Sequence, residues 1–153
     1  TDTLIGIEQI EFKDEVVELT AEEETTVSFS VTTGLTEITT VIGSGFADEM
    51  TSSSSNEIFS GGNGSDIYSF GEGTGTDQVK DFSVSEDVIE VKTSANGTSI
   101  SAAADILSRV TSTSDGALIN LGTDDAGVEH TILLQDVSVD DLTAANFSAV
   151  EIL

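Results

Sequence analysis

The residues of this chain that could do chemistry by their type and spacing lie in one glycine-rich stretch. Residues 61–69 read Gly-Gly-Asn-Gly-Ser-Asp-Ile-Tyr-Ser and fit the nonapeptide pattern Gly-Gly-x-Gly-x-Asp-x-apolar-x at every defined position. Glycine tolerates the positive φ angles that bring backbone carbonyl oxygens together, and the aspartate adds an anionic oxygen. Because Ca²⁺ prefers oxygen ligands of these two kinds, the stretch predicts a calcium-binding turn.

The nine-residue register continues upstream of this nonapeptide. Residues 52–60 and 43–51 keep an acid at the sixth position and an apolar residue at the eighth, although most of the glycines are replaced. The acids are Asp48, Glu57 and Asp66, and the apolar residues are Met50, Phe59 and Tyr68. A flexible Gly/Ser linker is the alternative interpretation, but a linker has no reason to keep acids and apolar residues at one period. The pattern favours a parallel β-roll in which two nonapeptides make one coil.

Stacked coils would bring the acids together along the two edges of the roll. Asp48 should lie over Asp66 with Ca²⁺ between the turns, and Glu57 should face Asp77, which arrives two residues late in the register. The predicted ligands are the carboxylates of Asp48 and Asp66, backbone oxygens around Gly43, Gly45, Gly61, Asn63 and Gly64, and a weaker pair, Glu57 and Asp77.

The charge balance excludes several kinds of partner. The 153 residues include 29 acids but only four basic residues, which gives a formal net charge of −25. We therefore expect no binding to nucleic acid, and we expect a monomer that folds when Ca²⁺ relieves the repulsion. The absence of cysteine excludes thiol catalysis, disulfides and Cys-ligated zinc.

Neither a membrane segment nor a catalytic motif is evident in the sequence. No apolar run approaches the length of a membrane span, so we expect no membrane insertion, and the amino terminus lacks the order of a cleavable signal peptide. The single histidine, His130, lies in a strand-like run, where a structural role is expected. Because no nucleophile elbow or zinc-protease helix occurs, we predict that the chain is not an enzyme.

The remaining sequence predicts an all-β fold around the roll. We expect a short calcium-binding parallel β-roll flanked by antiparallel hairpin or sandwich-like caps, with one short α-helix at 102–109 that Ser101 would N-cap. The predicted segments are N-terminal strands leading into the roll (1–42), the roll (43–82) and a β-rich cap (83–153). Alternating apolar residues or turn signals predict a hairpin at 3–19, strands at 26–31, 38–42, 77–82, 87–91, 117–121 and 130–134, and a short turn or helix at 140–142.

Several segments together resemble a known family. Residues 1–12, the nonapeptides 43–69, and residues 77–90, 132–137 and 141–147 are similar, in this order, to the C-terminal region of RTX proteins that bacterial type I systems secrete. Within that family the chain looks like the end of a large surface adhesin, although it has only one complete repeat.

The resemblance implies a location, partners and an export cycle. It implies an extracellular module at the bacterial cell surface, attached to upstream adhesin domains and folding on Ca²⁺ outside the cell. Its partners would be the type I secretion ABC transporter and outer-membrane export apparatus, which would read residues 83–153 as the signal. Polysaccharide-modifying enzymes that are secreted end in comparable modules, so a polysaccharide-binding β-roll is the alternative function.

Overall fold

The computed structural model describes residues 16–18, 27–30 and 39–151, and it consists of two β-sheets. The seven-stranded sheet contains, in spatial order, β1 (Val16–Glu18), β3 (Thr39–Ile42), β5 (Glu57–Ser60), β7 (Thr76–Val79), β11 (Glu129–Gln135), β10 (Gly116–Thr123) and β9 (Val110–Ser112). The five-stranded sheet contains β12 (Phe147–Val150), β8 (Val88–Lys92), β6 (Ile67–Phe70), β4 (Asp48–Thr51) and β2 (Val27–Ser30).

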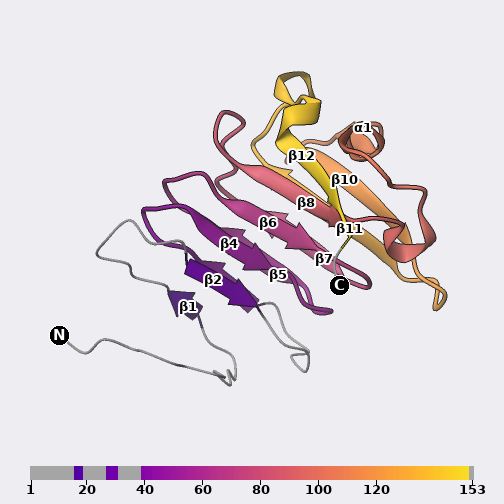
Figure 1. Cartoon of the computed structure of the whole chain (residues 1–153), viewed down its shortest axis with the longest axis horizontal. Coiled ribbons are helices and arrows are strands. Elements are labelled where there is room, and N and C mark those ends of the chain that lie inside the picture. The colour runs from indigo at the N-terminus through magenta and orange to yellow at the C-terminus, as the bar shows by residue number, and fades with distance from the viewer. Residues whose placement is uncertain (1–15, 19–26, 31–38, 152–153) are drawn as a thin grey trace.

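The chain alternates between the two sheets from β1 to β8, and this alternation makes the roll. Each strand pairs in parallel with the strand one coil later, as β4 does with β6 and β6 with β8. Figure 1 shows β2, β4, β6 and β8 lying side by side. The predicted inward residues Met50, Phe59 and Tyr68 are at most 1% exposed, so the core lies between the sheets.

The C-terminal strands extend both sheets. β11 pairs in parallel with β7, and β12 pairs in parallel with β8, whereas β9, β10 and β11 form an antiparallel meander. The α-helix, α1 (Ala103–Leu107), contacts β12 and buries Ile106 in the core. Three 3₁₀ helices complete the described elements: η1 (Ala95–Gly97), η2 (Val139–Asp141) and η3 (Ala144–Asn146). The predicted fold class, an all-β parallel roll with an antiparallel cap and one short helix, is confirmed.

Some local predictions need correction. The helix begins after Ala102, and Ser101 is not its N-cap: the Ser101 N–H and hydroxyl both donate to the Asp105 carboxylate, at 2.9 and 2.8 Å. The strand predicted at 77–82 ends at Val79, and Phe82 reaches the core from the following loop.

The predictions for the N-terminal part concern residues that lie partly outside the described ranges. The first arm of the hairpin expected at 3–19 lies outside the described residues, while Val16–Glu18 pairs in parallel with β3. The division into segments 1–42, 43–82 and 83–153 stays a prediction. Among the helices of the described residues, none is long and apolar enough to cross a membrane.

Candidate metal centre

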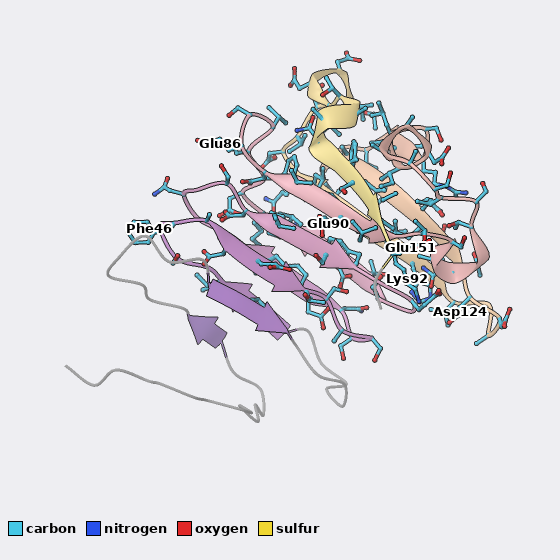
Figure 2. All side chains as sticks on the ribbon, viewed as in Figure 1. Phe46, Glu86, Glu90, Lys92, Asp124 and Glu151 are labelled. Atoms are coloured by element: carbon cyan, nitrogen blue, oxygen red, sulfur yellow. The ribbon has the colours of Figure 1, made fainter. Side chains whose placement is uncertain are left out.

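Five buried acids stand at the beginnings of roll strands. Asp48, Glu57, Asp66, Asp77 and Asp87 each precede an inward apolar residue by two positions, and each is at most 3% exposed. They divide between two edges. The Asp48 edge consists of loops 43–47, 61–66 and 80–87, and the Glu57 edge consists of loops 52–56 and 71–75. Figure 2 shows Phe46 and Glu86 on the Asp48 edge, with Lys92 and Asp124 lying toward the other.

Three of these acids donate a backbone hydrogen bond to the acid of the next coil. The Asp48 N–H donates to Asp66 Oδ1 at 2.9 Å, and the Asp66 N–H donates to Asp87 Oδ1 at 2.9 Å. On the Glu57 edge, the Glu57 N–H donates to Asp77 Oδ1 at 2.8 Å. The structure therefore brings together both predicted pairs, Asp48 with Asp66 and Glu57 with Asp77. It adds Asp87, whose place two residues before the inward Ile89 is a signal that the sequence contained.

Backbone oxygens converge on the glycines of the Asp48 edge. A Cβ atom at Gly43 would lie 2.5 Å from the Gly61 carbonyl oxygen and 2.7 Å from Asp48 Oδ2, and one at Gly61 would overlap Asp66 Oδ2. A Cβ atom at Gly64, which has φ +132°, would lie 2.6 Å from the Phe46 oxygen. These loops need glycine because neighbouring coils approach so closely. By contrast, Gly45 and Asn63 are exposed.

Three of the five carboxylates are held by a serine four residues earlier. The backbone N–H groups of Ser44, Ser53 and Ser83 donate to Asp48, Glu57 and Asp87 at 2.6, 3.1 and 2.8 Å. The hydroxyls of Ser44 and Ser53 donate to the same carboxylates. We call Asp48, Glu57 and Asp87 the serine-capped carboxylates.

The other two carboxylates have glycine at that position. Gly62 and Gly73 have positive φ, and their N–H groups donate elsewhere, to Asp81 Oδ2 at 3.0 Å and to Asn96 Oδ1 at 2.8 Å. As a result Asp66 Oδ2 and Asp77 Oδ2 are buried without a hydrogen-bond partner. We call Asp66 and Asp77 the open carboxylates. A buried anionic oxygen without a donor is costly, so each open carboxylate needs a proton or a cation.

Burial changes the acidity of these groups in the direction expected. Burial raises the pKa of Asp66 to about 6, assisted by the negative charges of Asp87 and Asp48. Burial likewise raises the pKa of Asp77 to about 8, with Glu57 as a charged neighbour. The pKa values of Glu57 and Asp87 are also raised by burial, and serine hydrogen bonds oppose the rise in both.

Two further side chains shape the Asp48 edge. The Asp81 carboxylate accepts hydrogen bonds from the Gly61 and Gly62 N–H groups, both at 3.0 Å, and thereby fixes the glycine loop from the next coil. The Tyr68 hydroxyl accepts from the Gly61 N–H at 3.1 Å, and burial raises its pKa, so it stays neutral. The sequence did not identify Asp81 because it falls outside the nine-residue register.

The donors available suit a hard cation. Within the described ranges, no group of three or more His, Cys, Asp or Glu side chains has the arrangement of a metal site. A cation would therefore be held by carboxylates from successive coils, completed by the backbone oxygens that crowd the glycines. All of these donors are oxygens, and the two buried carboxylate oxygens without partners give a cation a place to bind, so the residues fit Ca²⁺.

His130 has a structural position at the Glu57 edge. It is 3% exposed, and its Nδ1 accepts a hydrogen bond from the Gly75 N–H at 2.9 Å. Its Nε2 lies 3.3 Å from Asp124 Oδ2. The first contact joins β11 to loop 71–75, and the second lies within the turn between β10 and β11.

Together the fold and the site define an all-β roll with buried carboxylates along both edges. No protein-family model matches the sequence, and no curated protein matches it. One similar solved structure is the solution structure of the AlgE6R3 subunit from the Azotobacter vinelandii mannuronan C5-epimerase. It is 18% identical, with a TM-score of 0.46, and the match covers 82% of this chain and 79% of that chain.

Proposed function

We propose that this chain is a calcium-binding module whose fold depends on Ca²⁺. The observation that carries the proposal is the pair of buried carboxylate oxygens without partners, on Asp66 and Asp77. Filling these positions with a cation would satisfy both oxygens and offset part of a net charge of −25. Because a ligand that binds only the folded chain stabilises it, Ca²⁺ binding would contribute directly to folding.

The principal site lies on the Asp48 edge. Asp48 and Asp66 would supply the carboxylates, and the loops around Gly43, Gly61 and Gly64 would supply backbone oxygens. Gly45 and Asn63 belong to the same two loops. Asp77, with Glu57 beside it, would form a second and weaker site on the Glu57 edge, where loop 52–56 contains no glycine.

A calcium titration of the calcium-depleted chain tests this proposal. Far-UV circular dichroism should show a gain of β-structure as Ca²⁺ is added, and calorimetry should show one to three ions bound. Mg²⁺ is the matched control, because it dehydrates reluctantly and demands a stricter geometry, so it should bind far more weakly. A chain that is fully folded without calcium and binds none would refute the proposal.

We further propose that the module serves a non-enzymatic role at the end of an exported adhesin. The excess of acids and the absence of cysteine support passage as an unfolded chain from a low-calcium cytosol, followed by folding outside the cell. Its partners would be a type I ABC transporter and upstream adhesin domains. Removing residues 140–153 from a longer parent protein should abolish secretion by a co-expressed transporter, and normal secretion would refute the export role.

A second candidate function, polysaccharide binding, is favoured by one surface. An outward row crosses five strands of the seven-stranded sheet in register, and none of its members is acidic: Ile58, Gln78, Leu133, Leu118 and Thr111. In a chain this acidic, such a row suits a neutral glycan better than an anionic one. Retention on a neutral polysaccharide that Leu133→Asp abolishes would support this function. No retention of the unaltered chain would refute the function, and equal retention of both proteins would refute the assignment to this surface.

A further inference from the structure

The chain contains two Asn-Gly pairs, Asn63-Gly64 and Asn96-Gly97, in opposite environments. An Asn-Gly pair can react with itself, because glycine has no side chain to hinder attack by its backbone nitrogen on the preceding carboxamide. The reaction needs a carboxamide that is free to turn toward that nitrogen. The hydrogen bonding of each Asn side chain therefore decides which pair can react.

The Asn96 carboxamide is held at both ends. Its Oδ1 accepts a hydrogen bond from the Gly73 N–H at 2.8 Å, and its Nδ2 donates to the Leu121 carbonyl at 3.1 Å. The residue is 7% exposed. Its backbone N–H also donates to Glu72 Oε2, at 2.7 Å. Reaction at Asn96 would require these buried bonds to open first.

The Asn63 carboxamide is free of such restraints. Asn63 is exposed at the tip of loop 61–66, and among the hydrogen bonds of the described residues none involves its side chain. The backbone on either side of Asn63 is restrained. The Gly62 N–H donates to the Asp81 carboxylate, and Gly64 lies close to the Phe46 backbone. The side chain can therefore sample orientations that are closed to Asn96.

We propose that Asn63 is a site of spontaneous deamidation and that Asn96 is protected by the fold. The Gly64 nitrogen loses its proton and bonds to Asn63 Cγ, and the bond from Cγ to the amide nitrogen breaks, releasing ammonia and leaving a succinimide. Water then opens the succinimide at either carbonyl, giving aspartate or isoaspartate. The reaction is a hydrolysis overall and involves no oxidant or reductant.

The isoaspartate product would alter the candidate metal centre. It adds one methylene to the backbone of loop 61–66, the loop that places Asp66 beside the Asp48 N–H. This consequence rests on the proposed calcium function. We expect the isoaspartate form to bind Ca²⁺ more weakly than the fresh chain, while Asn63→Asp, which changes charge but not backbone length, keeps the affinity closer to the original.

Peptide mapping by mass spectrometry of the aged, full-length chain at neutral pH tests the proposal. Both Asn-Gly sites are followed in the native chain and in urea, where the denatured chain gives the intrinsic rate of each. The Asn96 side chain makes two hydrogen bonds, each worth about 1 kcal/mol. We therefore expect native structure to slow deamidation at Asn96 by at least about tenfold more than at Asn63. Asn63→Gln is the matched variant, because the longer side chain forms its cyclic intermediate far less readily.

The possible outcomes separate this inference from the calcium proposal. Equal protection at the two sites, or faster reaction at Asn96, would overturn the inference, because the packing of Gly64 against Phe46 would then outweigh the freedom of the Asn63 carboxamide. Preferential reaction at Asn63, absent from Asn63→Gln, would support it. If that preference held while Ca²⁺ neither bound nor slowed the reaction, the calcium proposal alone would fail.

Discussion

The serine-capped and open carboxylates occupy equivalent positions in the roll but differ in how they are stabilised. Asp48, Glu57 and Asp87 receive hydrogen bonds from a serine within their own loop. Asp66 and Asp77 have a glycine there and retain one buried oxygen without a partner. The roll thus contains two classes of buried acid, one stabilised by donors within its own loop and one that needs a proton or a cation.

This difference bears on the nonapeptides that have lost their glycines. Loop 52–56 contains four serines and no glycine, so it departs furthest from the nonapeptide pattern. Ser53 nevertheless donates to Glu57 through both its N–H and its hydroxyl. A loop that has lost its glycines can therefore keep the coil while it supplies its carboxylate with internal hydrogen-bond donors. Calcium dependence should be concentrated at Asp66 and Asp77.

The largest expected effect is on calcium affinity. Asp66→Asn keeps an oxygen that can accept from the Asp48 N–H but removes the charge of an open carboxylate. We expect Ca²⁺ affinity to fall at least about tenfold. Asp87→Asn is the matched variant at a serine-capped carboxylate, and its Ca²⁺ affinity should fall less. Calorimetry measures both, and equal losses would show that the serine contacts do not distinguish the two classes.

The next effect is on the pH dependence of folding without calcium. An aspartate with an ordinary pKa of 3.8 in the unfolded chain binds protons more tightly when folding raises its pKa. The stability that protonation gives is fully present below pH 3.8 and is lost as pH rises through about 6 for Asp66 and about 8 for Asp77. In calcium-depleted buffer, the folded fraction should fall from pH 5 to pH 8.

Saturating Ca²⁺ supplies the control for this pH effect. The bound ion would replace the proton at the open carboxylates, so the decline between pH 5 and pH 8 should nearly disappear. Circular dichroism at several pH values, with and without calcium, measures both profiles. Stability that rises with pH in calcium-depleted buffer would contradict the buried state of these acids.

A third effect concerns the glycines that leave the carboxylates open. Gly62 has φ +94°, and a Cβ atom there would overlap the Ser44 carbonyl oxygen, so Gly62→Ala should destabilise the fold by about 2–5 kcal/mol. Gly73 has φ +64° but open space around it, so Gly73→Ala should cost only about 1–2 kcal/mol. Urea unfolding at one fixed Ca²⁺ concentration compares them. Equal costs would mean that the contact between coils is unimportant.

The sequence predicted the positions of the acids well where the repeat is regular. Asp48 and Asp66 are 18 residues apart, as two nonapeptides require, and the structure places them in contact. The spacing grows to 20 residues between Glu57 and Asp77, and to 21 between Asp66 and Asp87. The strands stay in register because the loops absorb the extra residues. A search at fixed spacing therefore misses Asp87. A search for an acid two positions before an inward apolar residue finds all five acids.

Long-range pairing was beyond what the sequence could show. Alternation predicted the strand at 130–134, which corresponds to β11, but it does not say which earlier strand this strand joins, and it predicted no strand at β12. The choice of β7 for β11 and of β8 for β12 depends on the edges that the roll leaves open at its C-terminal end. Likewise, the donors to Asp81 and Asn96 lie 19 to 23 residues away and become visible only once the coils are stacked.

The smallest expected effect tests the serine cap itself. Ser53 is 8% exposed, and its hydroxyl donates to the Glu57 carboxylate, so Ser53→Ala should lower the free energy of unfolding by about 1–3 kcal/mol. The neighbouring Ser54 is exposed, so Ser54→Ala should change the free energy of unfolding by less than about 0.5 kcal/mol.

If the serine cap substitutes for a cation, the loss of stability in Ser53→Ala should be larger in calcium-depleted buffer than in saturating Ca²⁺. Urea unfolding under both conditions measures this difference. A loss that is independent of calcium would mean that Glu57 relies on Ser53 alone and that the Glu57 edge holds no ion.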